Sequence, residues 1–218
     1  NPPVNPLSDG VRAGLYEGIA KAEADSSVVG VVLTGNGRAF IAGADISEFG
    51  GSGEGHGLHE VFKKLEYCSK PVVAAINGLA LGGGLETALC CNYRIASNQA
   101  FVGLPEVNLG LLPGAGGTQR LPRLVGPSEA LKIMLSGSHV TAKKALSLGI
   151  VDSLSDNVVE DSIKFIKEKA ASSDSHPLVR DLNDKIIEAR GNDNILVEAQ
   201  AMTAKSRKGQ FAPGQIIK

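Results

Sequence analysis

Two runs of consecutive apolar residues, each closed by a glycine, constrain the fold of this chain most strongly. They are VVGVVLTG at residues 28–35 and KPVVAAING at residues 70–78. Strands buried on both faces of a parallel sheet have continuous apolar runs of this kind, so both segments predict buried strands. Apolar residues at helical spacing precede each run, at Leu7, Val11, Leu15, Ile19 and Ala22 and at Leu58, Val61, Phe62 and Leu65. Strands that alternate with helices predict an α/β fold.

The rest of the chain continues this alternation with shorter elements. Short strands are predicted at 92–97, 100–103 and 150–154, and helices at 127–136, 141–148 and 159–170. Thr141 and Gly149 are suitable as the N-cap and the stop of the second of these helices. Prolines make the segment between 104 and 126 loop-rich, and the glycines of residues 50–57 predict a mobile loop. Polar residues dominate from about residue 173, and residues 211–218 have the composition of a linker.

Composition excludes several classes of protein. The net charge of −1 gives no general attraction to nucleic acids or anionic membranes, so no nucleic-acid partner is expected. No apolar run approaches the roughly 20 residues of a membrane-spanning helix, and no signal or transit peptide is visible. The odd number of cysteines, Cys68, Cys90 and Cys91, predicts free thiols rather than disulfides, and hence a reducing intracellular setting.

Common signatures of nucleotide, hydrolase and metal sites are also missing from the sequence. There is no Gly-Lys dipeptide for a Walker A loop, and no G-x-S-x-G elbow. GAGGTQ has Gln119 where a dinucleotide-binding fingerprint needs its third glycine. His56 and His59 lie three residues apart without an obvious third ligand, so we expect no metal site.

Three short stretches carry the chemistry: IAGAD at 41–45, GGGLE at 82–86 and GLPE at 103–106. A glycine-rich turn that enters a helix leaves backbone N–H groups unpaired, and one such group from each of the first two stretches can bind a single oxygen. Such an oxyanion hole is worth roughly 3–4 kcal/mol for each well-placed donor. Two nearby glutamates suggest proton transfer, with at least one pKa raised by burial and mutual repulsion. The residues alone leave a second interpretation open, in which the glycines only pack and the glutamates only cap or pair.

The same motifs resemble the crotonase (enoyl-CoA hydratase/isomerase) superfamily, from about residue 1 to residue 172. AFIAGAD, KPVVAAINGLALGGGLETAL and GLPEVNLGLLPGAGGTQRLPRLVG occur in the order and spacing of that family. The resemblance implies a ClpP-like spiral of ββα units with a C-terminal helical region. It also implies that the N–H groups of Ala44 and Gly83 bind a thioester oxygen, and that Glu86 and Glu106 are the catalytic acid/base pair.

Further residues are assigned to the substrate by the same resemblance. Those expected to line its binding site are Ala42, Gly43, Asp45, Ile46, Gly82, Pro105 and Gly114. Many relatives have Lys or Arg two residues after the aspartate of GAD, near the coenzyme A phosphates. Ser47 occupies that position here, so Arg38 or another basic residue is expected to take the role.

Within the family, the chain is most similar to the hydratase domain of multifunctional β-oxidation enzymes. We therefore expect a hydratase core at 1–172 without the first family strand, and a helical segment and linker at 173–218. Fused 3-hydroxyacyl-CoA dehydrogenase domains, absent from this chain, or a homo-oligomer are the expected protein partners. A peroxisomal location is favoured, with the mitochondrial matrix as the alternative.

The expected function is hydration of trans-2-enoyl-CoA to 3-hydroxyacyl-CoA. Acyl-CoA is the substrate, and no metal or redox cofactor is expected. Two alternatives remain open: isomerisation of Δ3 to Δ2 double bonds in the same site, and a non-catalytic acyl-CoA-binding domain. The preferred acyl chain length cannot be read from the sequence.

Overall fold

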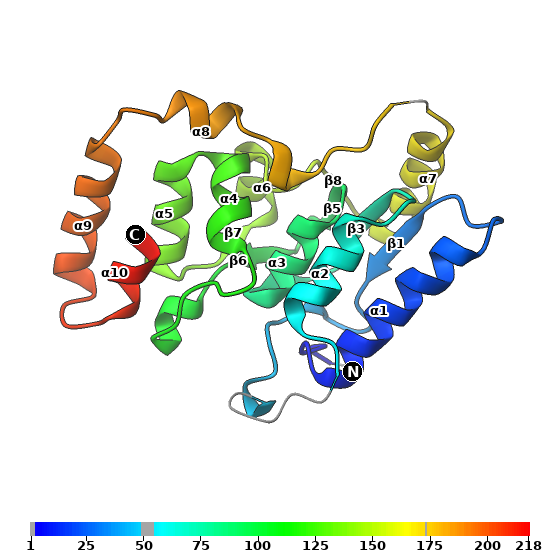
Figure 1. Ribbon diagram of the computed structural model, residues 1–218, viewed down its shortest axis with the longest axis horizontal. Helices are drawn as coiled ribbons and strands as arrows, with labels where there is room; N and C mark the ends of the chain where they lie inside the picture. Colours follow the sequence, from blue (N-terminus) through cyan, green and yellow to red (C-terminus); the bar gives the residue numbers. More distant parts are fainter. Residues whose placement is uncertain (1–2, 49–54, 173) are drawn as a thin grey trace.

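The first six described strands of the chain alternate between two sheets, and each of the last two joins one of them (Figure 1). The computed structural model describes residues 3–48, 55–172 and 174–218. In the first sheet the order is β1 (Val31–Thr34), β3 (Val72–Ile76), β5 (Tyr93–Ser97) and β8 (Ser153–Ser155), with parallel neighbours. In the second it is β2 (Ala39–Ile41), β4 (Leu79–Leu81), β6 (Phe101–Gly103) and β7 (Val140–Thr141), where only the β6–β7 pair among those described is antiparallel.

Each pair of strands leads into a helix, which produces a spiral of ββα turns. β1 and β2 precede α2 (Leu58–Glu66), and β3 and β4 precede α3 (Gly83–Cys90). β5 and β6 precede the short 3-10 helix η2 (Glu106–Leu109) and α4 (Gly117–Val125). The α/β class and the ββα spiral predicted from the sequence are therefore confirmed. Most of the glycine-rich loop expected to be mobile at residues 50–57, namely residues 50–54, lies outside the described residues.

The first helix and strand differ in detail from the prediction. Helix α1 (Asp9–Ala24) begins after Ser8, so Leu7 precedes the helix and forms a β-bridge with Ala44 instead. Strand β1 was expected to be buried, but it is half-buried and its Thr34 is exposed. Its position explains the difference, because β1 lies at the end of the strand order and, among the described strands, pairs with β3 alone. β3 is buried along its whole length, as predicted.

The later helices follow the capping signals of the sequence. Pro127 begins α5 (Pro127–Ser136), and the Thr141 side chain caps α6 (Ala142–Leu148) by accepting a hydrogen bond from the N–H of Lys144. Helix α7 (Val158–Ala171) then packs on β1, β3 and β5. Helix α4 was not predicted because Pro122 lies inside it, yet the helix packs against α3, α5 and α8, and these contacts stabilise it.

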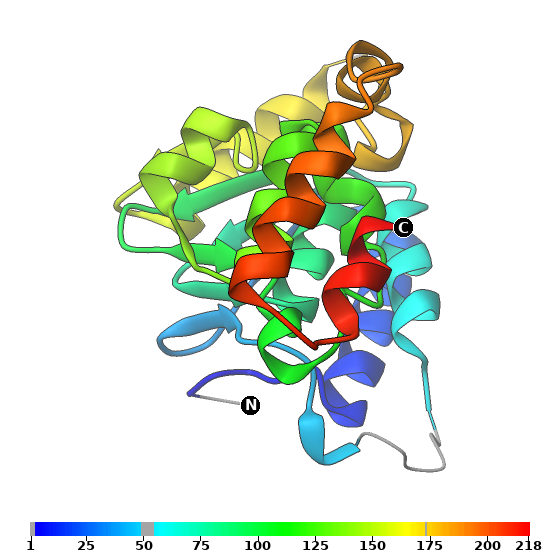
Figure 2. The same cartoon turned by 90° about the vertical axis from the view of Figure 1, so that its left-hand side faces the viewer.

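The C-terminal segment covers the side of the molecule formed by α5 (Figures 1 and 2). It contains η3 (Val179–Asp181), α8 (Asp184–Glu188), α9 (Asn194–Ser206) and α10 (Ala212–Ile217). The expectation of a linker at the end of the chain differs from the structure. Helix α10 packs against α5 and α9, and it buries Ala212, Pro213 and Ile216.

A continuous apolar core lies between the sheets and their helices. Its largest fully buried side chains include Phe40, Phe62, Ile76, Leu85 and Leu104. Cys90 and Cys91 belong to this core, Cys68 packs at its border, and all three thiols are free, as predicted. Among the described residues, no helix combines the length and apolar character required to cross a bilayer.

Candidate active site

The IAGAD turn is held next to the N-terminal segment of the chain. The N–H of Leu7 donates a hydrogen bond to the carbonyl of Gly43 at 2.9 Å, and Leu7 pairs with Ala44 in a parallel bridge. Gly43 has φ of +135°, a conformation that side chains disfavour. This turn follows β2 directly and places Ala44 beside the start of α3.

Each position of the GGG stretch requires glycine for a different structural reason. Gly82 has φ of +54° and ψ of −126°, which turns the chain from β4 into α3. A Cβ on Gly84 would lie 1.9 Å from the carbonyl oxygen of Ile41, so glycine allows α3 to pack directly on β2. A Cβ on Gly83 would lie 2.9 Å from Cδ1 of Leu7. The packing interpretation of these glycines is therefore correct for Gly84, but it is incomplete for the other two.

Ala44 and Gly83 come together as the sequence predicted. The Cβ position of Gly83 lies 3.6 Å from the backbone nitrogen of Ala44, and both residues line the same cavity. Among the described residues, neither N–H group has a hydrogen-bond acceptor. Two free donors at the wall of a cavity can bind one negatively charged oxygen.

Glu86 lies at the N-terminal end of α3 and is 3% exposed. Its Oε1 accepts hydrogen bonds from the N–H groups of Ala115 at 2.9 Å and Gly117 at 2.7 Å. Burial raises the pKa of Glu86, while these two hydrogen bonds and the positive charge of Arg120 oppose the rise. Glu86 is therefore a fixed carboxylate that also lines the cavity.

Glu106, in η2, is the second carboxyl group at the cavity. Burial raises its pKa to about 7, and the negative charge of Glu86 adds to the rise. Its Oε2 is buried and has no hydrogen-bond partner among the described residues. Its Oε1 lies 3.1 Å from the Cβ position of Gly82, so both catalytic candidates adjoin the same glycine turn. An unpaired carboxyl group with a pKa near neutrality can give or take a proton at pH 7.

The cavity that these groups share has a volume of about 790 Å³. All four predicted catalytic and oxyanion residues line it, and so do six of the predicted substrate-binding residues: Ala42, Gly43, Asp45, Gly82, Pro105 and Gly114. Ile46 lies in the 3-10 helix η1 (Ile46–Glu48), and its side chain is outside what the structure describes. Arg38 is exposed and does not line the cavity.

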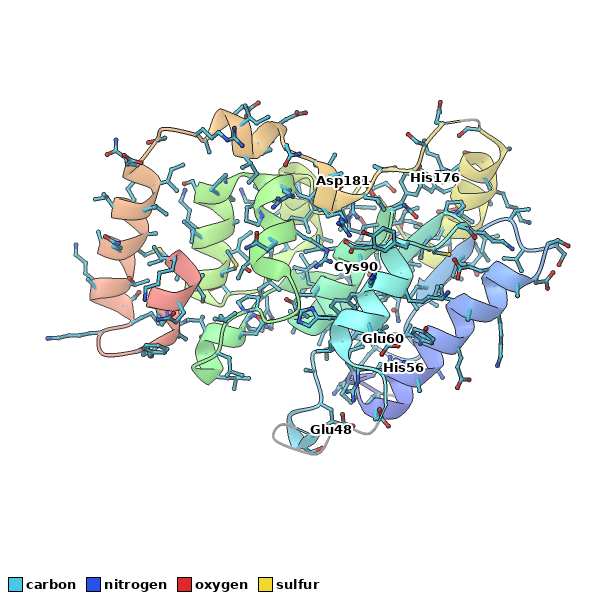
Figure 3. All side chains as sticks on the ribbon, viewed as in Figure 1. Glu48, His56, Glu60, Cys90, His176 and Asp181 are labelled. Atoms are coloured by element: carbon cyan, nitrogen blue, oxygen red, sulfur yellow. The ribbon has the colours of Figure 1, made fainter. Side chains whose placement is uncertain are left out.

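Several residues that line the cavity were not predicted from the sequence to belong to a binding site. The apolar ones are Leu7, Leu58, Leu81, Leu109, Leu111, Leu112 and Ala115. The polar ones include Asp9, Arg12, Glu48 and His59. Arg12, from α1, donates hydrogen bonds of 2.8 Å to Glu48 Oε2 and to the carbonyl of His56. In Figure 3, Glu48 and His56 lie on the same side of the molecule, near the start of α2. These residues come together only in the tertiary structure. The helical spacing of Leu7 in the sequence predicts a core residue and does not show that it also lines the cavity.

Known proteins share this arrangement of elements. A model of the enoyl-CoA hydratase/isomerase family matches residues 1–212. The chain belongs to this family. The peroxisomal bifunctional enzyme of Cavia porcellus is 44% identical over 222 residues, which cover 100% of this chain but only 30% of that protein. The chain thus spans about 30% of the length of this curated relative.

Solved structures of bacterial proteins support membership of the enoyl-CoA hydratase/isomerase family. DspI of Pseudomonas aeruginosa has a TM-score of 0.72 at 34% identity, covering 96% of this chain and 90% of its own. Enoyl-CoA hydratase from Bacillus anthracis has a TM-score of 0.69 at 30% identity, covering 95% of this chain and 90% of its own. The predicted crotonase architecture is therefore confirmed.

Proposed function

We propose that this chain hydrates trans-2-enoyl-CoA to 3-hydroxyacyl-CoA. One observation carries the proposal: two free N–H groups and two glutamates of raised pKa, Glu86 buried and Glu106 half-buried, line a single cavity. Membership of the enoyl-CoA hydratase/isomerase family supports the reaction class. The non-catalytic alternative gives no reason for Glu106 to keep an unpaired buried carboxyl oxygen, which is costly to a fold.

In the proposed reaction the thioester oxygen binds to the N–H groups of Ala44 and Gly83. Glu86 takes a proton from water while the water oxygen bonds to C3 of the enoyl group. The electron pair of the C2–C3 double bond moves toward the carbonyl, and the resulting enolate oxygen is stabilised by the two donors. Glu106 supplies a proton to C2, so one molecule of water is added to the substrate. Proton exchange with solvent then returns Glu86 to its ionised form and Glu106 to its protonated form.

The environments of the two carboxyl groups support these different roles. Two backbone N–H groups favour the ionised form of Glu86, as a base requires. Glu106 has no such donors on Oε2 and has a pKa of about 7, so a large fraction is protonated near neutral pH, as an acid requires.

The size and lining of the cavity suit a small-molecule substrate with an apolar chain. Its volume of about 790 Å³ is within the usual range for small-molecule sites, and leucines form much of its wall. Addition of water leaves the oxidation state of the molecule as a whole unchanged, so the reaction needs no redox cofactor. The carboxyl groups and N–H donors supply the acid, base and electrostatic stabilisation, so the proposal includes no metal.

Isomerisation of Δ3 to Δ2 double bonds is a second candidate for the same site. The unpaired Oε2 of Glu106 favours it, because one carboxylate can remove a proton from one carbon and return it to another. The same oxyanion donors would stabilise the dienolate formed in between. Activity with 3-enoyl-CoA but not with crotonyl-CoA would favour isomerase over hydratase.

The first experiment is an absorbance assay of the purified chain with crotonyl-CoA. We expect loss of the enoyl-thioester absorbance as 3-hydroxybutyryl-CoA forms. Binding of crotonyl-CoA without turnover, measured by calorimetry, would instead support a non-catalytic acyl-CoA-binding domain. A parallel assay with 3-enoyl-CoA measures the isomerase activity separately.

We also propose protein partners and a cellular location for this domain. Its curated relative is a much longer bifunctional protein, which supports fused 3-hydroxyacyl-CoA dehydrogenase domains, with a homo-oligomer as the alternative. The word peroxisomal in that relative's name supports a peroxisomal location, with the mitochondrial matrix as the alternative. NAD-dependent turnover of crotonyl-CoA and fluorescence imaging, both on the full-length protein, test the two proposals.

A further inference from the structure

Glu86 is held by a short loop that is itself held by Arg120. The N–H groups of Ala115 and Gly117 donate to Glu86 Oε1 at 2.9 and 2.7 Å. The carbonyl oxygen of the same Ala115 accepts a hydrogen bond from Nη1 of Arg120 at 3.1 Å. Ala115 therefore links the two side chains. Its N–H binds the carboxylate of Glu86, and its C=O binds the guanidinium of Arg120.

Arg120 has a fixed partner of its own. Its Nε donates to Glu66 Oε1 at 2.8 Å, and the side chains of the two residues are 14% and 5% exposed. Arg180 approaches the other carboxylate oxygen of Glu66 at 3.7 Å. An ion pair buried to this degree restricts the guanidinium, because moving it away would deprive Glu66 of its closer charged partner, at 2.8 Å, and leave it the more distant Arg180.

The backbone of residues 115–117 has the shape needed to contact both Arg120 and Glu86. Gly116 has φ of +103°, and a Cβ there would lie 2.0 Å from Nη1 of Arg120. A Cβ on Gly117 would lie 3.0 Å from Glu86 Oε1. Glycine at both positions lets the backbone lie directly between the guanidinium and the carboxylate.

We propose that Arg120 is a positioning residue for Glu86, acting through residues 115–117 and held in place by Glu66. Its kinetic consequences rest on the proposed function, in which Glu86 deprotonates water. The planar fork of arginine binds Ala115 and Glu66 at the same time, in fixed directions. Lysine keeps the charge but has no such fork, so it is expected to replace arginine only in part.

The charged and titratable groups that face Glu86 come from several elements. They are Arg120 on α4, His59 on α2, Glu106 in η2 and Cys90 on α3 itself. The positive charge of Arg120 lowers the pKa of Glu86 against the effect of burial. A variant without this charge should therefore move the acid limb of the kcat–pH profile to higher pH, which a general loss of packing would not do.

The test compares the variants R120K, R120M and R120M/E66Q with the unmodified chain, and uses R123M as the matched control. Arg123 lies on the same helix, and its hydrogen bonds go to the carbonyls of Gln119 and Arg180 rather than to Ala115. Each protein is assayed with crotonyl-CoA across pH. Thermal unfolding and hydrogen exchange at the amides of Ala115 and Gly117 are measured in parallel.

We expect R120M and R120M/E66Q to lose roughly 10- to 100-fold in kcat. KM should stay within about twofold, because the oxyanion donors and cavity walls are unchanged. R120K should fall between them and the unmodified chain, with an unshifted acid limb. The double variant should recover thermal stability, since no buried carboxylate is left unpaired, but it should not recover kcat.

The proposal is overturned if R120M/E66Q keeps the kcat, pH profile and amide exchange of the unmodified chain. If the unmodified chain does not hydrate crotonyl-CoA, the proposed function fails, and amide exchange alone decides the role of Arg120. Faster exchange at Ala115 and Gly117 in R120M/E66Q than in R123M then supports the positioning role. Equal exchange in the two variants contradicts it.

Discussion

The Cβ position of Gly83 lies 3.6 Å from the backbone nitrogen of Ala44. A methyl group at residue 83 would thus partly fill the space in front of both free N–H groups. We predict that G83A lowers kcat for hydration roughly 100- to 1,000-fold, as expected when an oxyanion donor is lost. The measurement is steady-state kinetics with crotonyl-CoA.

The stability of G83A should change little, because its closest neighbour is the movable Cδ1 of Leu7. G14A is the matched control, since a Cβ on Gly14 in α1 meets no heavy atom within 4 Å. It should keep full activity and gain about 1 kcal/mol of stability. Normal activity in G83A would contradict the oxyanion assignment.

Gly84 should behave in the opposite way to Gly83. In G84A the new Cβ would meet the carbonyl oxygen of Ile41 at 1.9 Å, and a backbone atom cannot move aside without shifting β2. We predict a loss of about 3 kcal/mol or more in the free energy of unfolding, measured by urea denaturation. A variant as stable as G83A would show that α3 and β2 do not pack as closely as described.

Glu106 should make stability depend on pH. Its carboxyl group has a pKa of about 7 in the folded protein and an ordinary pKa near 4.5 when unfolded. Between these values the folded chain binds more protons than the unfolded chain, so stability falls as pH rises through this window. The full loss above pH 7 is on the order of 3 kcal/mol.

E106Q removes this dependence without changing the shape of the side chain. We predict that it is more stable than the unmodified chain at pH 8 and equally stable at pH 4, measured by urea denaturation. An equal difference at both pH values would show that the carboxyl of Glu106 does not titrate in this window.

Arg207 links the C-terminal segment to the helical turn that carries Glu106. Its Nη2 donates to Asn108 Oδ1 and to the carbonyl of Ser136, both at 2.6 Å. Because Asn108 lies in η2, we predict that R207M lowers kcat roughly 10-fold through looser placement of Glu106. K205M, an exposed change in the last turn of α9, just before Arg207, is the control and should keep its activity. Unchanged kcat in R207M would show that the contact of the C-terminal segment with η2 does not contribute to catalysis.

Short-range patterns were sufficient to predict the alternation of strands and helices, and the resemblance of the motifs to a known family implied the ββα spiral and the four central residues. The glycine turns that position Ala44 and Gly83 are local in sequence. Glu86 lies in the first turn of the helix that follows the GGG turn, and Glu106 is the first residue of η2. Their chemistry is therefore visible in a few adjacent residues, and the spacing between the motifs matches that of a known family.

The supporting residues could not be predicted in the same way. Arg120 lies in a segment whose prolines and glycines suggested a loop, and its helix depends on contacts with α3, α5 and α8. Leu109 and Leu112 surround the cavity only because η2 and the following loop fold over it. Arg38 is exposed and lies outside the cavity lining, so its expected contact with the coenzyme A phosphates stays a prediction.

The central claim is that Glu86 and Glu106 together add water to an enoyl thioester. The most direct measurement is kcat for crotonyl-CoA hydration by E86Q and E106Q, with calorimetric binding of crotonyl-CoA, and with E17Q on the exposed face of α1 as control. We predict a loss of roughly 100- to 10,000-fold in each catalytic variant, with nearly unchanged binding and a fully active control. Hydration at a near-normal rate by either E86Q or E106Q would contradict the account.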